Sequence, residues 1–430
     1  MSTQERRTLF HWFTGPLNDS IRSSLSTYTS AYTEVISLFH SVFEFDGIDS
    51  ISGIVLLESL PPVDIPSQPL HKSIDFYKTL VKMTKHSIAA YGYDHDKAYT
   101  FIDSKDFDET LKNSSRTSIQ IAYICSRAEI FPNMVLHYNF TPTLFCCAYF
   151  IALDPSINAL VLSIRGTFSL NDIVSDMILY NSEFSYHGED GVVHSGIYKT
   201  ALETFKDAKD HIENALKNYP NLKFLITGHS LGGSVAQIIT LLIKQWRPEW
   251  DIHCYAIAPA PIFGENLATN EEVRSLIDSV IFDSDMVPSL SMASCKHLVA
   301  RMNKVLTQMD FDYLLFISKM AKGMSTSQAA KEMVEAKGIV LDDTIDTFFS
   351  PGPLWPVGEV CYMKREGDGK FSMNTAENKS FTTIRVSNTF LADHFPLNYV
   401  IVTTKLLQQL TGEKIVTKRK ERFVQALEMC

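Results

Sequence analysis

Hydrophobic residues alternate between strand-like and helix-like spacing through the middle of the chain. Short apolar runs typical of buried strands occupy 144–153, 159–164, 222–227, 254–258 and 279–282. Between these runs, apolar residues recur every three or four positions over 196–218 and again from Ser234 onward, which predicts amphipathic helices. Strands that alternate with helices form a mostly parallel sheet with helices on both faces. We therefore predict an α/β fold.

The flanking segments have a different texture. Apolar residues at helical spacing between Ile74 and Tyr91 predict a helix in the N-terminal part of the chain. Apolar residues over 295–348 interrupt the alternation and predict a helical insertion over one end of the sheet. A hairpin is expected to turn at 367–369, followed by a strand at 381–386, a loop and a final helix.

These patterns divide the chain into three parts. We expect a helical N-terminal region packed on the core in residues 1–115, an α/β domain with its insertion in 116–405, and a basic C-terminal helix or tail in 406–430. The last 30 residues hold six basic and three acidic side chains in an otherwise acidic chain.

Composition excludes several classes of protein. The chain has 430 residues, of which 45% are hydrophobic and 20% charged, so it can bury a large core. Its 39 basic and 49 acidic residues give a net charge of −10, which argues against a nucleic-acid partner. The seven cysteines are odd in number and several lie in apolar runs, which favours a reducing compartment. The N-terminus has no signal-peptide pattern.

Two uncharged stretches are long enough to span a membrane. They occupy 133–153 and 224–243. Both contain glycine, proline, histidine or asparagine, so we interpret them as buried strands with turns. No transmembrane helix is expected.

The strongest chemical signal is the segment from Gly228 to Gly233, with the sequence Gly-His-Ser-Leu-Gly-Gly. It lies between a predicted buried strand and a predicted helix. A serine on such a sharp turn is lifted out of the sheet, and the glycines permit close packing around it. The start of the next helix also points amide N–H groups toward the serine. Ser230 is therefore the candidate nucleophile.

A serine hydroxyl needs a base, and in this strand–turn–helix context the partners follow in the order acid, then histidine. His297 and His394 lie beyond the acidic candidates, and we favour His394 because His297 falls within the predicted helical insertion. Asp283 and Asp285 both follow the strand at 279–282, and spacing alone does not choose between them. Pro288 fixes Asp285 in a loop, so we favour Asp285 and interpret Asp283 as a solvated turn residue.

A second donor to the oxyanion is expected from a loop after an earlier strand. The strand at 159–164 is followed by Arg165, Gly166 and Thr167. Thr167 offers a backbone N–H and a hydroxyl, and Gly166 permits a close approach. A simple turn with a surface arginine is the alternative.

Four segments together resemble the class 3 lipase family of α/β-hydrolases. The four segments are 163–167, 228–233, 285–288 and 393–396, and the resemblance covers roughly residues 75–405. Ala89 to Gly92 is similar to a helical segment of the sn-1-specific diacylglycerol lipase branch. The resemblance implies an α/β-hydrolase fold, with the helical insertion between the acid and the histidine.

The resemblance also implies roles for individual residues. Ser230 would be the nucleophile, Asp285 and His394 its partners, and the backbone amides of Thr167 and Leu231 the oxyanion hole. It implies that 169–177 is a lid or a substrate-facing helix. The family often has arginine directly after Val-Pro, where this chain has Ser289.

These features predict a serine hydrolase that cleaves acylglycerols, with diacylglycerol as substrate, through an acyl-enzyme. The alternatives are a phospholipase or other carboxylesterase using the same residues, or a lipase-like scaffold without turnover. No cofactor or metal motif is present in the sequence. We expect a cytoplasmic protein with peripheral contact to membranes or lipid droplets. Its basic residues at 418–422 would either bind anionic lipid or form a solvated helix face.

Overall fold

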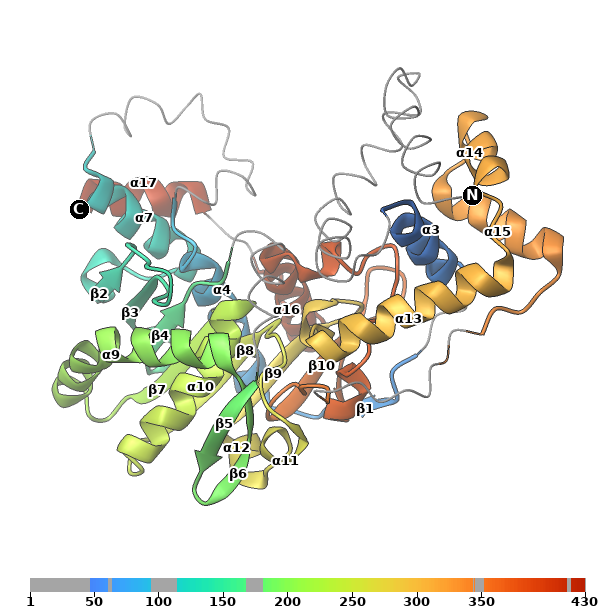
Figure 1. Cartoon of the computed structure of the whole chain (residues 1–430). Coiled ribbons are helices and arrows are strands. Elements are labelled where there is room, and N and C mark those ends of the chain that lie inside the picture. Colours follow the sequence, from blue (N-terminus) through green and yellow to red (C-terminus); the bar gives the residue numbers. More distant parts are fainter. Residues whose placement is uncertain are drawn as a thin grey trace.

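A computed structural model of the chain describes residues 47–60, 64–93, 114–167, 181–342, 344, 352–415 and 419–429. These residues form one large sheet of nine strands and a separate two-stranded hairpin (Figure 1). The strand order in the large sheet is β1-β11-β10-β9-β8-β7-β4-β3-β2.

The nine strands follow one another along the chain in a different order from their order in the sheet. They are β1 (Ser67–Pro69), β2 (Val135–Asn139), β3 (Tyr149–Asp154), β4 (Ala159–Ile164), β7 (Lys223–His229), β8 (Ile252–Ile257), β9 (Ile277–Phe282), β10 (Glu359–Arg365) and β11 (Phe371–Ala376). β4, β7, β8, β9 and β10 are parallel, and the strands outside them are antiparallel. The prediction of a mostly parallel sheet is confirmed.

Helices cover both faces of this sheet. The longer ones are α3 (Gly47–Glu58), α4 (Ile74–Ala89), α7 (Arg116–Ala128), α9 (Ser195–Asn218), α10 (Leu231–Trp246), α13 (Met292–Met309), α15 (Thr326–Lys337), α16 (Pro396–Thr411) and α17 (Arg419–Met429). The shorter α14 (Tyr313–Ala321) lies between α13 and α15, and the hairpin of β5 (Asn181–Tyr186) and β6 (Glu189–His194) precedes α9.

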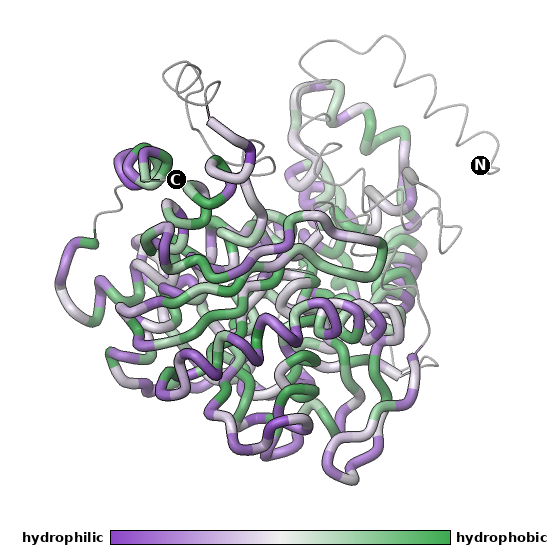
Figure 2. Tube along the Cα trace, turned by 90° about the vertical axis from the view of Figure 1, so that its left-hand side faces the viewer, coloured by the Kyte–Doolittle hydropathy of each residue, from purple (hydrophilic) through white to green (hydrophobic). Residues whose placement is uncertain are grey.

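Alternate residues of β4 show how the two faces are filled. Leu160 and Leu162 belong to a hydrophobic cluster that includes residues of α9, α10 and α13, whereas Ala159 and Val161 belong to a second cluster with α4 and α16. Every residue of β4 is buried because both sides of the sheet are covered. The strands of the interior are accordingly mostly hydrophobic along their length (Figure 2).

The segment between β9 and β10 contains the predicted helical insertion. α13 begins with a capping box in which Ser291 and Ser294 exchange hydrogen bonds between side chain and backbone. α3 from the N-terminal region lies beside α13 and α15 (Figure 1). A Cβ on Gly53 would lie 2.7 Å from the Cβ of Met302, so α3 and α13 approach each other closely at that glycine.

Two predicted strands differ from the structure. Residues 381–386 are not a strand, because this segment is an irregular loop in which Phe381 and Ile384 are buried and Arg301 donates to the carbonyl of Ile384 over 2.9 Å. The apolar spacing there reflects a buried loop. The strand predicted from residue 144 begins only at Tyr149, because Thr143 and Cys146 pair with each other in a turn. The hairpin predicted at 367–369 is confirmed between β10 and β11.

Candidate active site

Ser230 occupies the turn between β7 and α10. Its backbone has φ 59° and ψ −129°, a conformation that residues other than glycine rarely adopt. The neighbouring backbone is close enough to exclude side chains: a Cβ on Gly232 would lie 2.3 Å from the carbonyl oxygen of Ile164. The turn therefore presses against the end of β4, and this contact requires glycine.

The structure brings three of the predicted residues together. The Nε2 of His394 lies 3.0 Å from the Oγ of Ser230. The Nδ1 of His394 lies 3.1 Å and 3.0 Å from the two carboxylate oxygens of Asp285. Their exposed fractions are 0% for Ser230, 1% for Asp285 and 8% for His394, so these contacts are shielded from bulk water. In this arrangement the imidazole can accept a proton from Ser230 while Asp285 fixes its tautomer.

The carboxylate of Asp285 is held by two further donors. The backbone N–H of Val287 donates to Oδ1 over 2.9 Å, and the hydroxyl of Tyr399 donates to Oδ2 over 2.6 Å. Burial, and then the negative charge of Asp285, raise the pKa of Tyr399 well above its ordinary value, so the phenol keeps its proton. The Tyr399 oxygen also accepts from the N–H of Phe282 over 3.0 Å. Sequence reasoning did not find Tyr399.

His229, directly before Ser230, forms a hydrogen bond with the backbone of His394. Its Nε2 lies 2.8 Å from the backbone carbonyl oxygen of His394, and its Nδ1 lies 2.8 Å from the hydroxyl of Tyr91. Burial, and then the nearby ring of His394, hold the pKa of His229 well below its ordinary value, so the ring is neutral. Because a carbonyl only accepts, Nε2 carries the proton and the Tyr91 hydroxyl donates to Nδ1.

Asp283 is not the solvated turn residue that the sequence suggested. It lies on the same loop as Asp285, where its carboxylate contacts Arg365 at 2.5 Å and its side chain is only 21% exposed. The carboxylate that contacts His394 is that of Asp285, the candidate that the position of Pro288 favoured in the sequence.

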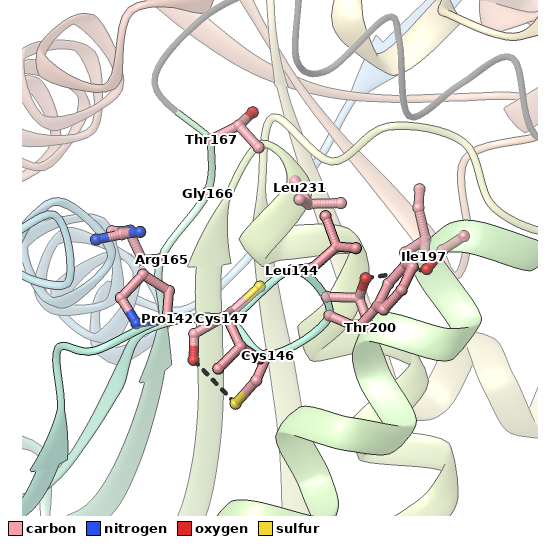
Figure 3. Close-up of a pocket in the computed structure, with 13 residues that line it drawn as sticks. Pro142, Leu144, Cys146, Cys147, Arg165, Gly166, Thr167, Ile197, Thr200 and Leu231 are labelled. Carbon is pink, nitrogen blue, oxygen red and sulfur yellow. Dashed lines mark hydrogen bonds between the residues drawn. The ribbon is translucent and has the colours of Figure 1, made fainter.

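Thr167 and Leu231, the residue directly after Ser230, both line a pocket (Figure 3). A Cβ on Gly166 would lie 2.3 Å from the carbonyl oxygen of His229, so the loop after β4 touches the turn that carries Ser230. The Oγ1 of Thr167 is buried and has no hydrogen-bond partner among the residues that the structure describes. An unused buried hydroxyl at this position is available to a ligand.

The pocket has a volume of about 210 Å³. Its lining is mostly apolar and comes from the turn before β3, the loop after β4 and the start of α9, and includes Leu144, Phe145, Cys146, Ile197 and Thr200. Apolar walls next to the nucleophile suit a hydrocarbon chain. The segment 169–177, expected to be a lid or a substrate-facing helix, lies outside the described residues.

Other expectations concern the surface and the membrane. Lys418 and the side chains of residues 419 and 420 lie outside the described part of the chain, and Arg422 is exposed on α17. Across the described ranges, no helix has the length and hydropathy to cross a membrane. Within the same ranges, no group of three or more metal-ligating side chains is arranged to hold a metal ion.

The sequence of the chain is similar to a family model and to several known proteins. A family model described as Lipase (class 3) matches residues 161–295, which include Ser230 and Asp285. Diacylglycerol lipase-beta of Mus musculus is 22% identical over 299 residues, covering 61% of this chain and 44% of the relative. Phospholipase A1 PLIP2, chloroplastic, of Arabidopsis thaliana is 30% identical over 165 residues, covering 37% of this chain and 23% of the relative.

The chain spans less than half the length of these two curated relatives. Among solved structures, the native Rhizomucor miehei lipase propeptide complex is similar with a TM-score of 0.47 and 15% identity, covering 78% of this chain and 84% of that one. The observed sheet, with a strand, a sharp turn and a helix around Ser230, confirms the expected α/β-hydrolase fold.

Proposed function

Because the chain belongs to the class 3 lipase family, near its diacylglycerol lipase branch, we propose that it is a serine-dependent lipase that hydrolyses ester bonds of acylglycerols. The observation that carries the proposal is the position of His394, with Nε2 3.0 Å from Ser230 and Nδ1 3.0 Å from Asp285. Thr167 and Leu231, the two proposed donors to the oxyanion, line an apolar pocket, and Leu231 directly follows Ser230 in the chain.

In the first half of the reaction, Ser230 forms the acyl-enzyme. Its Oγ attacks the ester carbonyl carbon while its proton passes to the Nε2 of His394. The electron pair of the carbonyl moves onto oxygen, where the amides of Thr167 and Leu231 and the hydroxyl of Thr167 donate to it. Collapse of this intermediate breaks the ester C–O bond, and His394 returns the proton to the departing glyceride oxygen.

In the second half, water replaces the alcohol. His394 takes a proton from the water as the water oxygen attacks the acyl carbon. When the tetrahedral intermediate collapses, the bond from the acyl carbon to the Ser230 Oγ breaks, His394 gives the proton to that Oγ, and the fatty acid is released. Asp285 stays ionised throughout and stabilises the imidazolium. Tyr399 and the N–H of Val287 hold its carboxylate in position.

Diacylglycerol is the proposed substrate because the matched relatives include a diacylglycerol lipase and because an apolar pocket adjoins Ser230. Contact with a lipid surface goes with this proposal. Leu144, at the pocket, is 87% exposed, and Phe395, directly after His394, is 46% exposed. Exposed apolar side chains around a site mark a surface that favours lipid. The cytoplasmic location stays a prediction.

A phospholipase activity is the second candidate, favoured by the similarity to the Arabidopsis phospholipase A1. Lipase and phospholipase activity are distinguished by comparing the rates at which the protein hydrolyses diacylglycerol, monoacylglycerol, triacylglycerol and phosphatidylcholine in mixed micelles. We expect diacylglycerol to be hydrolysed fastest, with the activity lost in Ser230→Ala. Ser234→Ala, one turn further along α10, is the matched control and should retain it. Faster release from phosphatidylcholine would replace the proposed substrate, and equal rates in Ser230→Ala would refute the mechanism.

A further inference from the structure

We propose that Arg365, at the end of β10, is a positioning residue that joins the loop carrying Asp285 to the loop carrying His394. The inference rests on the proposed function of these two residues. Among the residues that the structure describes, Arg365 forms no hydrogen bond or ion pair with Ser230 and does not line the pocket. It acts through two carboxylates, Asp283 and Asp393, which lie beside the two functional residues in sequence.

The contacts of Arg365 connect both loops. Its Nη1 lies 2.5 Å from the Oδ2 of Asp283 and 3.0 Å from the Oδ2 of Asp393, and its Nη2 contacts the Oδ1 of Asp393. Asp393 also accepts from the N–H of Ser284 over 3.2 Å and from the hydroxyl of Thr389 over 2.8 Å. One guanidinium thus bridges a carboxylate from each loop, and Asp393 reaches across to the backbone of the other.

Burial makes the cation necessary. Asp393 is 0% exposed, and an ionised carboxylate removed from water is costly unless it is paired. Arg365 provides the charge, and its planar fork provides two donors in fixed directions. Its guanidinium also lies 4.4 Å from the centre of the Phe282 ring at the end of β9, which fixes the side chain beneath the loop.

The joined loops hold the distance between the functional residues. Asp283 has a φ of 45°, so the chain bends sharply just before Asp285. The N–H of Met286 donates to the carbonyl of Phe390 over 3.2 Å, a second link between the same two loops. If Asp393 lost its cation, the loop that ends in His394 would shift to solvate the carboxylate, and Nδ1 would move away from Asp285.

A second arginine near the same loop makes a different contact. In the described part of this chain, Arg385 donates to the backbone carbonyl of Asp283 over 3.1 Å, whereas Arg365 forms ion pairs with the carboxylates of both Asp283 and Asp393.

The experiment compares Arg365→Met with Lys364→Met, its neighbour on β10. Lys364 pairs with the exposed Asp64 at 2.7 Å, so its removal is a matched loss of one surface cation. The probe is a short soluble p-nitrophenyl ester, with circular dichroism to verify folding. We expect Arg365→Met to lower kcat by about 30-fold or more with KM nearly unchanged, and Lys364→Met to keep wild-type kinetics. Equal kcat in the two variants would overturn the proposal.

Three further variants test the charge pairing, including the case in which Arg365→Met alone does not fold. Arg365→Lys keeps the charge and should recover part of the lost kcat. Asp393→Asn removes the buried charge. The double variant Asp393→Asn/Arg365→Met should lose no more kcat than about the larger of the two single losses, because neither charge is then left unpaired. Multiplicative losses in the double variant would contradict the pairing.

A fluorophosphonate label separates this inference from the proposed function. Labelling of Ser230 in the wild-type protein reports whether the nucleophile is activated at all, and its absence would refute the proposed function. Wild-type labelling together with an undiminished labelling rate in Arg365→Met would refute the positioning role alone.

Discussion

The hydroxyl of Tyr399 donates to the Oδ2 of Asp285 over 2.6 Å, although 114 positions separate the two residues in the chain. Tyr399 lies on α16, directly after the loop that carries His394, and Asp285 follows β9. One helix therefore sets the positions of both partners of the nucleophile: its first turn follows the histidine, and its buried phenol orients the acid.

Replacement of Tyr399 by phenylalanine should lower kcat by about 10-fold, since a hydrogen bond to a charged group contributes about 1.5–3 kcal/mol and Val287 still donates to Asp285. KM should change little. Tyr255→Phe, where the ring packs against Phe76 in the core, is the control. The measurement is steady-state kinetics on a soluble ester, and an unchanged kcat in Tyr399→Phe would show that the phenol does not orient Asp285.

Thr167 distinguishes a hydroxyl contribution from an amide contribution to the oxyanion hole. Thr167→Val removes the buried hydroxyl that has no partner among the described residues but keeps the backbone N–H. Stability should stay the same or rise, because an unsatisfied buried group is lost. Because the hydroxyl is proposed to donate to the oxyanion, kcat should fall by about 100-fold. Thermal denaturation and kinetics measure the two effects, and a variant with full activity would leave only the amides as donors.

Gly232 should tolerate no side chain. The Cβ of an alanine there would lie 2.3 Å from the carbonyl oxygen of Ile164 and 2.8 Å from the backbone nitrogen of Gly166, so the loop that carries Thr167 must move. We expect a stability loss of about 1–3 kcal/mol and a much larger proportional loss of activity. In Gly352→Ala, the control, the added Cβ meets no atom within 4 Å. Urea denaturation and ester hydrolysis are the assays, and an active Gly232→Ala variant would disprove this close contact.

His86 should make stability depend on pH. Its ring is fully buried beside Asp154, and burial lowers its pKa despite the attraction of that carboxylate. Lys82, 3.0 Å from the same carboxylate oxygen, and Glu129 are the nearby charged groups. Below about pH 6.5 the unfolded chain binds a proton at this histidine that the folded chain does not. His86 therefore does not reduce the free energy of unfolding above that pH. Below it, the free energy of unfolding should fall as the pH drops toward 5.

The His86 contribution is measured by urea denaturation at several pH values. His86→Gln should show a shallower decrease between pH 7 and 5 than the wild type, by up to about 1.4 kcal/mol per pH unit. His71→Gln, at an exposed position, should follow the wild-type slope. An identical slope in His86→Gln would show that this histidine does not titrate differently on unfolding.

The sequence was most informative where the chemistry is local. The turn from Gly228 to Gly233 was recognisable because the glycines, the strand and the helix that it requires are contiguous. Chain order then reduced the histidines to His297 and His394, and Pro288 favoured Asp285. The structure places Ser230, Asp285 and His394 within hydrogen-bonding distance.

The supporting residues could not be predicted because their partners are remote in the chain. Tyr91 lies 138 positions from His229, and Arg365 lies 82 positions from Asp283. The spacing of residues within a short stretch of sequence does not predict such pairs. The strand expected at 381–386 failed for a related reason: burial of Phe381 and Ile384 produces the same apolar spacing in a loop as in a strand.

The central claim, that His394 and Asp285 activate Ser230, is tested most directly by mass spectrometry after brief exposure to a fluorophosphonate. The account predicts one added group on the tryptic peptide that contains Ser230, no label in Ser230→Ala, and strongly slowed labelling in His394→Ala with the fold intact. Label on a different serine, or equally fast labelling of Ser230 without His394, would contradict it.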